Sequence, residues 1–293
     1  MKIGTHDGAF HTDEVLAIAT LLMVYPDAEI IRSRDPNVLA TCDIRVDVGR
    51  KYDPKTGDFD HHQPEGAGKR KNGIKYSSFG LVWKEYGHRI MQDAEARQFI
   101  ETAIVQSVDA HDNGQTLLKP AGDFGNVFPF NFSMAISSLN LYWDEPDELQ
   151  EGQFKAAVAM GTTVLTRLIG RAQSNIRSKG IVEKAVATAK DERLIILDIA
   201  CPWHEVVIKN APKALFVLLP ERSGKWNVQT IPQAIGSKTY RKSLPRAWKG
   251  LDGEAFAAQT GVHDAVFAHN GLFICGARSY EGALRLAELA LAS

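Results

Sequence analysis

The chain has 293 residues, more than a single hydrophobic core usually serves, so one large or two modest domains are expected. Hydrophobic residues make up 44% and charged residues 24%, which excludes a wholly disordered or fibrous chain. Lysine plus arginine (34) nearly balances aspartate plus glutamate (35). The net charge of −1 excludes a globally basic nucleic-acid coat, although not a local basic strip.

The cysteines and the N-terminus indicate the compartment. Three widely spaced cysteines cannot form a disulfide framework, and a reducing cytoplasm is the natural environment for such a chain. The start MKIGTHDGAFH has neither a cationic leader nor a transit-type segment, and no apolar run approaches the ~20 residues of a membrane span. We therefore expect a cytoplasmic protein without a membrane partner, and a homodimer is compatible with the sequence.

The first elements predict a βαβ arrangement. Apolar spacing favours a strand at Lys2–Thr5, a helix from Asp13 to Pro26, and strands at Glu29–Arg34 and Ile44–Val48. Alternation of strands and helices at this spacing is typical of a parallel sheet, in which ligands bind beyond the carboxyl ends of the strands. His6 and Asp47 lie at such ends.

The rest of the chain predicts a long polar loop, a helical connector and a second α/β unit. The loop covers residues 50 to 76, and helices are expected from Ser77 or Ser78 to Ile90 and from Ala94 to Val108. A long helix follows from Gln150 to about Ala189, with Gly180 as an expected break. We predict three parts: 1–150, an α/β domain; 151–190, a helical connector; and 191–293, a smaller α/β domain. Its expected strands and closing helix are Leu194–Leu197, Ala214–Leu219, Trp226–Ile231, Ala265–His269, Leu272–Cys275 and Glu281–Ala290.

Histidines and aspartates gather in the first 62 residues. Imidazole and carboxylate together suit Mn²⁺, Fe²⁺, Zn²⁺ or Co²⁺. The segment GTHDGAFHTDE places three possible metal ligands, His6, His11 and Asp13, on one turn and helix start. Asp47 can approach from the neighbouring strand, and the DHH motif can approach from the long loop. The candidate ligands are His6, His11, Asp13, Asp47, Asp60, His61 and His62.

Each of these residues also has an ordinary explanation. A loop histidine is most often a solvated side chain, and Asp13 could simply cap the helix that follows it. Asp47 is different, because it interrupts the apolar strand Val46–Val48, and a buried carboxylate costs several kcal/mol unless it is paired or metal-bound. Taken together at one sheet edge, the residues favour a metal centre.

A second polar cluster, DAHDNG, ends the helix that begins at Ala94. Asn113–Gly114 is a common helix stop. Two carboxylates at a helix C-terminus nevertheless oppose the helix dipole, and a metal ion would compensate for them. Asp109 is the preferred candidate ligand because it still lies on the helix, and Asp112 is the alternative.

The ordered motifs GTHDGAFHTDE, DFDHHQ, DAHDNG, RKSLP, WKGL and HNGLFICG resemble the MYG1 (UPF0160) family, which is related to the DHH phosphoesterases. The resemblance covers essentially the whole chain. It implies an α/β protein in which a DHH-like parallel-sheet domain with flanking helices is joined to a smaller DHHA1-like α/β domain, with an active-site cleft between them. It also implies a centre of two divalent ions, usually Mn²⁺.

The resemblance also implies roles for the candidate residues. His6 and His11 would hold one ion, and Asp13, His61 and Asp109 the other. Asp47 would bridge the two ions, and His62 would face the substrate phosphate. Most DHH enzymes have an aspartate where His11 stands, and the spacing here is one residue longer. An added imidazole shifts selectivity towards softer ions, so Mg²⁺, Zn²⁺ and Co²⁺ are alternatives to Mn²⁺.

Basic segments are candidates for holding a substrate. Lys69, Arg70 and Lys71 follow the loop that contains the DHH motif. Residues 238 to 249 carry five more cationic side chains, and the aromatic residues Tyr240 and Trp248 lie in the same segment. Cations for phosphates and rings for base stacking are the parts of a single-strand groove, although a solvated basic loop is the ordinary alternative. With the family resemblance, the candidate substrate contacts are Lys69, Arg70, Lys71, Arg241, Lys242, Arg246 and His269.

These observations predict a metal-dependent hydrolase. The chain contains no GxSxG, HExxH or P-loop motif, so a serine hydrolase, a zincin-type protease and a P-loop enzyme have no support. The leading hypothesis is a phosphodiesterase that acts as a 3′–5′ exonuclease on RNA or short oligonucleotides by two-metal hydrolysis. A small-molecule phosphoesterase or pyrophosphatase, and a non-catalytic RNA-binding protein with structural metals, are the alternatives. The family has also been labelled a metal-dependent protein hydrolase.

Overall fold

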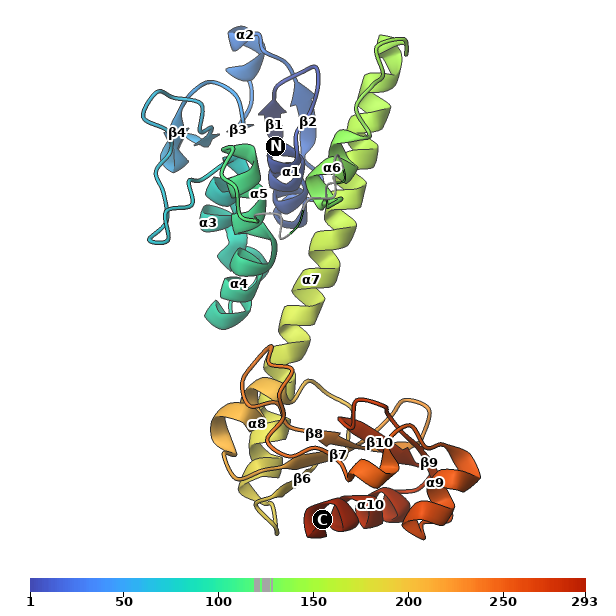
Figure 1. Cartoon of the computed structure of the whole chain (residues 1–293). Coiled ribbons are helices and arrows are strands. Elements are labelled where there is room, and N and C mark those ends of the chain that lie inside the picture. Colours follow the sequence, from blue (N-terminus) through green and yellow to red (C-terminus); the bar gives the residue numbers. More distant parts are fainter. Residues whose placement is uncertain (119–121, 123–126, 128) are drawn as a thin grey trace. The chain divides into compact units, whose positions relative to one another are not determined.

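The computed structural model describes residues 1–118, 122, 127 and 129–293 (Figure 1). Two compact units divide the chain, Met1–Gln173 and Ser174–Ser293. The helix α7 (Gln150–Ala187) contributes to both units and continues through Gly180, so the expected break there is wrong. The predicted borders of a separate connector, 151 and 190, stay a prediction.

The first unit is built on a five-stranded sheet in the order β2-β1-β3-β5-β4. The strands β2, β1, β3 and β5 run parallel, whereas β4 pairs antiparallel with β5 at the edge. The expected purely parallel sheet is therefore mixed. The strands are β1 (Lys2–Thr5), β2 (Glu29–Arg32), β3 (Ile44–Val46), β4 (Tyr52–Asp53) and β5 (Asp58–Phe59).

Helices α1, α3 and α5 of this unit pack against one another, as Figure 1 shows beside β1. The first half of α1 is buried on every side, which explains its continuous apolar run from Val15 to Ala19. The helices are α1 (Thr12–Val24), α2 (Pro36–Leu39), α3 (Ser78–Ile90), α4 (Ala94–Ile100), α5 (Gln106–Asp112) and α6 (Phe132–Ser137), with short turns η1 (Pro54–Thr56) and η3 (Asp147–Leu149).

Three expectations for this unit need correction. The helix expected from Ala94 to Val108 reaches Asp112 and contains a π turn, η2 (Glu101–Val105), between α4 and α5. The region from 50 to 76 is not one open loop, because it contributes β4 and β5 to the sheet. Asp47 lies just beyond β3 rather than inside a strand, with a left-handed backbone φ of 55°.

The second unit has a five-stranded sheet in the order β6-β7-β8-β10-β9, in which only β6 and β7 pair in parallel. Each expected strand and the closing helix is present within about two residues of its expected ends. The elements are β6 (Leu194–Ile196), α8 (His204–Asn210), β7 (Phe216–Pro220), β8 (Trp226–Thr230), η4 (Arg246–Trp248), α9 (Gly253–Thr260), β9 (Ala265–Ala268), β10 (Ile274–Ala277) and α10 (Tyr280–Ala292).

Alternating residues of β7 enter two separate cores. Phe216 and Leu218 pack with α9 and α10, whereas Val217 and Leu219 pack with α8 and the end of α7. Because successive strand residues point to opposite faces, the sheet is covered by helices on both sides. Among the described residues, no helix combines the length and apolarity that crossing a membrane requires.

Candidate metal centre

The strand ends of the first sheet bring the candidate ligands together. β1, β3 and β5 are parallel neighbours, with Gly4 opposite Arg45 and Val46 opposite Phe59. The chain continues from β1 into His6, from β3 into Asp47 and from β5 into Asp60. Because carboxyl ends of parallel strands meet at one edge of the sheet, these three residues emerge side by side.

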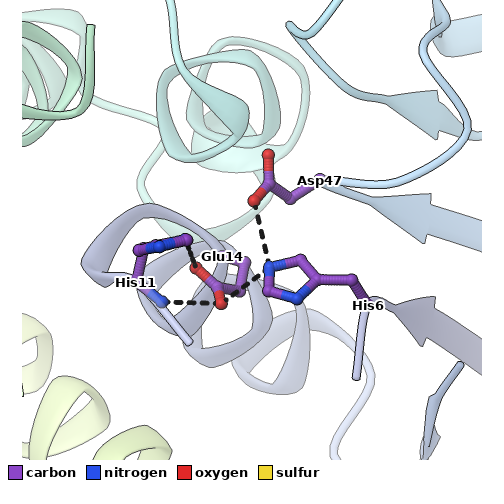
Figure 2. Close-up of side chains that lie close together, drawn as sticks. All are labelled: His6, His11, Glu14 and Asp47. Carbon is purple, nitrogen blue, oxygen red and sulfur yellow. Dashed lines mark hydrogen bonds and ion pairs between the residues drawn. The ribbon is translucent and has the colours of Figure 1, made fainter. Parts of the chain in front are cut away.

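The first candidate group combines two imidazoles and two carboxylates, as Figure 2 shows: His6, His11, Glu14 and Asp47. His6 Nε2 lies 3.1 Å from Glu14 Oε1 and 3.4 Å from Asp47 Oδ2. Each of the four side chains offers one ligand atom, and these atoms all lie within 4.8 Å of one another. The other ring nitrogen of His6 lies 3.0 Å from the Asp7 carbonyl oxygen, which fixes the ring orientation.

A second group joins Asp47 to His61 and His62. Asp47 presents Oδ2 to His6, while Oδ1 lies 3.4 Å from His61 Nε2 and 3.3 Å from His62 Nδ1. Asp60 stands behind His62, because its Oδ1 lies 2.9 Å from His62 Nδ1 and accepts the His62 backbone N–H. Asp47 thus faces two candidate sites, and Asp60 orients the candidate ligand His62 rather than joining one of the groups.

The third group is Asp13, His61 and Asp112. His61 Nε2 lies 3.0 Å from Asp112 Oδ2 and 3.8 Å from Asp13 Oδ2. Ser78, at the start of α3, donates its hydroxyl to Asp47 at 2.9 Å and its backbone N–H to Asp13 at 3.2 Å. Asp13 is not the cap of α1, since His11 occupies that position. The ordinary explanation for Asp13 is therefore wrong.

Several buried atoms of the cluster make no hydrogen bond of regular geometry within the described chain. They are one oxygen each of Asp13 and Glu14, and Nε2 of His61, which has only its ion-pair contacts with Asp112, Asp47 and Asp13. Asp13, Glu14 and Asp47 are all nearly inaccessible to solvent. Buried carboxylates without partners are costly unless a cation neutralises them. These orphaned atoms, together with the mixture of imidazoles and carboxylates, fit divalent ions.

The titration behaviour of the cluster points the same way. Burial raises the pKa of Asp13 well above its usual range, and the nearby Asp47 and Asp112 carboxylates raise it further. For His6, burial lowers the pKa, but Asp47 and Glu14 outweigh it and raise the pKa to about 10. For His61, burial again lowers the pKa, but the Asp112 and Asp47 carboxylates outweigh it and raise the pKa to about 9. Protons therefore occupy the positions for which a divalent ion would compete.

Asp47 and His62 complete this balance. Burial would raise the pKa of Asp47, but hydrogen bonds from His6, His61 and His62 hold it well below its usual range. The Asp47 and Asp60 carboxylates, which accept from the His62 ring, raise the pKa of His62 to about 10, against a smaller effect of burial. The pKa of Asp47 is thus shifted towards the ionised form, whereas that of its neighbour Asp13 is shifted towards the protonated form.

The cluster opens into a pocket of about 580 Å³ in the first unit, which we call the metal-side pocket. Its wall includes His61 and Asp112, and three exposed imidazoles, His11, His62 and His111. The side chains of His11 and His62, which belong to the candidate groups, are 62% and 56% accessible. A bound molecule could reach these two imidazoles directly, whereas His6 and Asp13 lie beneath the surface.

Asp109 lies apart from the three groups. Its Oδ2 pairs with Arg70 Nη1 at 2.7 Å, and its Oδ1 accepts from Ser77 Oγ at 2.5 Å and from the Gly80 backbone at 3.0 Å. A Cβ at Gly80 would lie 1.9 Å from Asp109 Oδ2, so only glycine permits this approach. Burial raises the pKa of Asp109 to about 6 in spite of these donors. Geometry therefore favours Asp112 over Asp109 as a candidate ligand.

The candidate substrate contacts are placed outside this cluster. Arg70 is paired with Glu101 and Asp109, and Lys71 lines a different pocket. Lys69 is exposed and pairs with Lys75 at the base of a short hairpin.

In the second unit, Arg241 donates to the carbonyls of Ile208, Ala211 and Ala214, and thus ties together the end of α8. Lys242 donates to the Leu291 carbonyl, and Trp248 is buried against Phe256. Arg246 and His269 are exposed. Arg241 and Lys242 therefore have structural contacts, and a substrate role for the four cationic candidates Arg241, Lys242, Arg246 and His269 stays a prediction.

Sequence reasoning missed Glu14 and Ser78. Glu14 stands three residues after His11, and its carboxylate accepts the His11 backbone N–H at 2.7 Å, as in a capping box. That spacing could have identified it. Ser78 follows a helix cap and carries no sequence signal of its own, because its contact with Asp47 spans 31 residues.

Comparisons with known proteins cover nearly the whole chain. A family described as uncharacterised protein family UPF0160, MYG1 exonuclease, matches residues 2–291. A human protein named MYG1 exonuclease is 35% identical over 99% of this chain and 86% of its own length. MYG1 proteins of Dictyostelium discoideum (35% identical, 98% and 95% covered) and Chlamydia pneumoniae (32%, 99% and 96%) are similar as well. A solved pGpG-specific phosphodiesterase from Vibrio has a TM-score of 0.30 at 14% identity, covering 99% of this chain and 97% of its own, which supports no inference.

Proposed function

The chain belongs to the MYG1 (UPF0160) family, and we propose that it is a metal-dependent phosphodiesterase that removes nucleotides from the 3′ end of RNA or short oligonucleotides. Relatives named exonucleases support this class of reaction. The observation that carries the proposal is the sharing of Asp47 and His61 between adjacent candidate groups. Sharing of this kind suits more than one ion in a single centre, as two-metal phosphodiester hydrolysis requires.

The candidate residues would divide the work as follows. His6, His11 and Glu14 would hold one ion, and Asp13, His61 and Asp112 a second, with Asp47 facing both. We propose Mn²⁺, because oxygen and imidazole donors are mixed. When bound, the ions would supply Lewis-acid stabilisation for the phosphodiester oxygens.

His62 is the candidate substrate-facing group. Its ring is exposed in the metal-side pocket while Asp60 holds Nδ1, so Nε2 is the nitrogen left for a phosphate oxygen. His11, at the same surface, stands at the start of α1, where backbone N–H groups and the helix dipole favour an anion. Both features suit a phosphodiester approaching from solvent.

The proposal is tested with an oligoribonucleotide labelled at its 5′ end. With Mn²⁺, we expect the label to move through a ladder of progressively shorter products, and a chelator to stop the reaction. A blocked 3′ terminus should prevent shortening, and the Asp47→Asn variant serves as the inactive control. Hydrolysis of pyrophosphate or a cyclic dinucleotide with RNA left intact would indicate a small-molecule phosphoesterase instead. RNA binding without turnover, equal in the wild type and in Asp47→Asn, would indicate a non-catalytic protein.

A further inference from the structure

The first unit contains a second pocket that the metal centre does not use. It encloses about 740 Å³, larger than the metal-side pocket, and the two share no lining residue. The hairpin from Lys69 to Lys75 forms one wall, and side chains of α3, α4, η2 and α5 form the others. The Arg70 N–H donates to the Ile74 carbonyl and the Gly73 N–H donates to the Arg70 carbonyl, which closes the hairpin around Asn72–Gly73, a typical tight-turn sequence. We call this cavity the basic pocket.

Cations dominate its lining. The lining includes four cationic side chains, Arg70, Lys71, Lys84 and Arg97, and one carboxylate, Glu101. Its net charge is therefore +3 with His88 neutral. Glu101 is already paired with Arg70. Arg97 is also engaged, because it donates to two carbonyls at the end of α3. Lys71 and Lys84 have no ion pair within the described residues, so both are available to an anionic ligand.

Aromatic rings accompany these cations. Tyr76 is partly exposed, with the Arg70 guanidinium 4.1 Å and the Lys84 ammonium 5.3 Å from its ring centre. Trp83 is buried and closes the wall behind them. Amide side chains of Asn72 and Gln98 lie at the surface of the same pocket. Phosphates can pair with the ammonium groups, and bases can stack against the partly exposed Tyr76 ring or the Arg70 guanidinium that lies over it, as in single-strand sites.

The helix α5 connects the two pockets. Gln106, at its start, lines the basic pocket, and Asp112, at its end, lines the metal-side pocket. Six residues of α-helix span about 9 Å along the axis. A strand held at the basic pocket could therefore extend to the metal centre, whereas a dinucleotide at the metal centre would leave most of the basic pocket empty.

We propose that the basic pocket binds a segment of single-stranded oligonucleotide beyond the nucleotides that flank the bond that is cleaved. This inference rests on the proposed nuclease function for its purpose, but not for its test. An acidic peptide could use the same lysines, but the partly exposed Tyr76 ring and the Asn72 and Gln98 amides beside them are groups that contact and hydrogen-bond to bases. The chemistry of the lining thus favours a nucleic-acid strand.

Binding is measured first without catalysis. A fluorescent 12-nucleotide RNA is titrated into the full chain in EDTA, so that the result does not depend on hydrolysis. We expect the Lys71→Glu/Lys84→Glu variant to bind at least about tenfold more weakly. The slope of log affinity against log salt concentration should also become shallower by about 1.4, since each lost phosphate contact removes ~0.7 for single strands. Lys155→Glu, an exposed lysine of α7 outside the pocket lining, is the matched control and should bind as the wild type does.

Two ligand variants examine the chemistry. An abasic 12-mer should bind the wild type about tenfold more weakly than RNA does, because it cannot stack. Equal binding of the abasic strand, or equal competition by a polyglutamate of the same charge, would overturn the assignment to a nucleic-acid strand. Unchanged RNA affinity in the folded double variant would overturn the proposal altogether.

Hydrolysis gives a separate measurement. With Mn²⁺, the ratio of kcat/KM for the 12-mer to that for a dinucleotide should fall about tenfold in the double variant and stay constant in Lys155→Glu. An equal loss on both substrates would place the lysines at the metal centre and overturn the proposal. If the wild type cleaves neither substrate, the proposed function fails, while the binding measurement still decides the basic pocket.

Discussion

Asp47 and Asp109 are both buried aspartates of the first unit, but their surroundings differ in kind. Asp109 faces the guanidinium of Arg70, a cation that never loses its charge and cannot leave. Asp47 faces three imidazoles, which can release protons and accept a metal ion. The adjacent serines Ser77 and Ser78 bind the two carboxylates separately. A permanent partner makes a structural ion pair, whereas exchangeable partners leave room for a ligand.

The largest effect should follow from Asp47→Asn. The substitution keeps the shape, and asparagine tolerates the left-handed φ of 55°, so the fold should be retained. Hydrolysis should fall on the order of 10⁴-fold, as is typical for a group central to catalysis. A urea titration adds a readout without activity: Mn²⁺ at 100 times its Kd should stabilise the wild type by about 2.7 kcal/mol and leave the variant nearly unaffected. Normal cleavage by Asp47→Asn would remove the distinction between the two aspartates.

Replacing the permanent cation should affect stability. Arg70→Met leaves Asp109 buried beside no cation, and losing one partner of a buried pair costs roughly 3–5 kcal/mol. Hydrogen exchange of the α3 and α5 amides would report this loss within the first unit. The double variant Arg70→Met/Asp109→Leu should regain most of it, because the fully buried Asp109 charge is removed together with its partner and only the partly exposed Glu101 loses Arg70. A cost below about 1 kcal/mol for the single variant would show that Asp109 does not depend on Arg70.

Two aspartates of α5 sharpen the comparison further. Asp112→Asn should weaken Mn²⁺ binding by about 10- to 100-fold, because its carboxylate lies 3.0 Å from His61 in a candidate group. Asp109→Asn should leave Mn²⁺ affinity nearly unchanged while it reduces stability. Calorimetric titration with Mn²⁺ separates the two outcomes. The reverse pattern would restore the sequence-based choice of Asp109 as the ligand.

The smallest effects should come from the two serines. Ser77→Ala removes a donor from the buried Asp109 carboxylate and should cost about 1–3 kcal/mol of stability. Ser78→Ala removes the donor to Asp47 and should weaken Mn²⁺ binding about tenfold. Urea unfolding and calorimetry on both variants would show whether neighbouring residues serve different carboxylates. Equal effects of both variants on Mn²⁺ affinity would mean that the two regions act as one.

Local sequence patterns located much of this arrangement. The strand Lys2–Thr5 and the cap and span of α3 followed from apolar spacing and capping residues. The gathering of His6, Asp47 and His61 followed from the rule that parallel strands end at one edge. The preference for Asp109 over Asp112 rested on its place on the helix and on the family resemblance; it stays a prediction, and the geometry favours Asp112, which also lies on α5. The competing cation, Arg70, is 39 residues away in the chain, and no local pattern shows that pair.

The π turn η2 has a consequence for how the chemistry of this unit arose. A π turn corresponds to one residue inserted into an α-helix, and each residue turns an α-helix by about 100°. Removing one residue between Glu101 and Val105 would rotate everything that follows on α5 by that angle relative to α4. Asp112, at the end of α5, would then no longer point towards His61, although the amino-acid composition of the helix would be almost unchanged. Insertions and deletions should therefore be tolerated least between Glu101 and Val105, because one residue there sets the direction in which the side chains of α5 point.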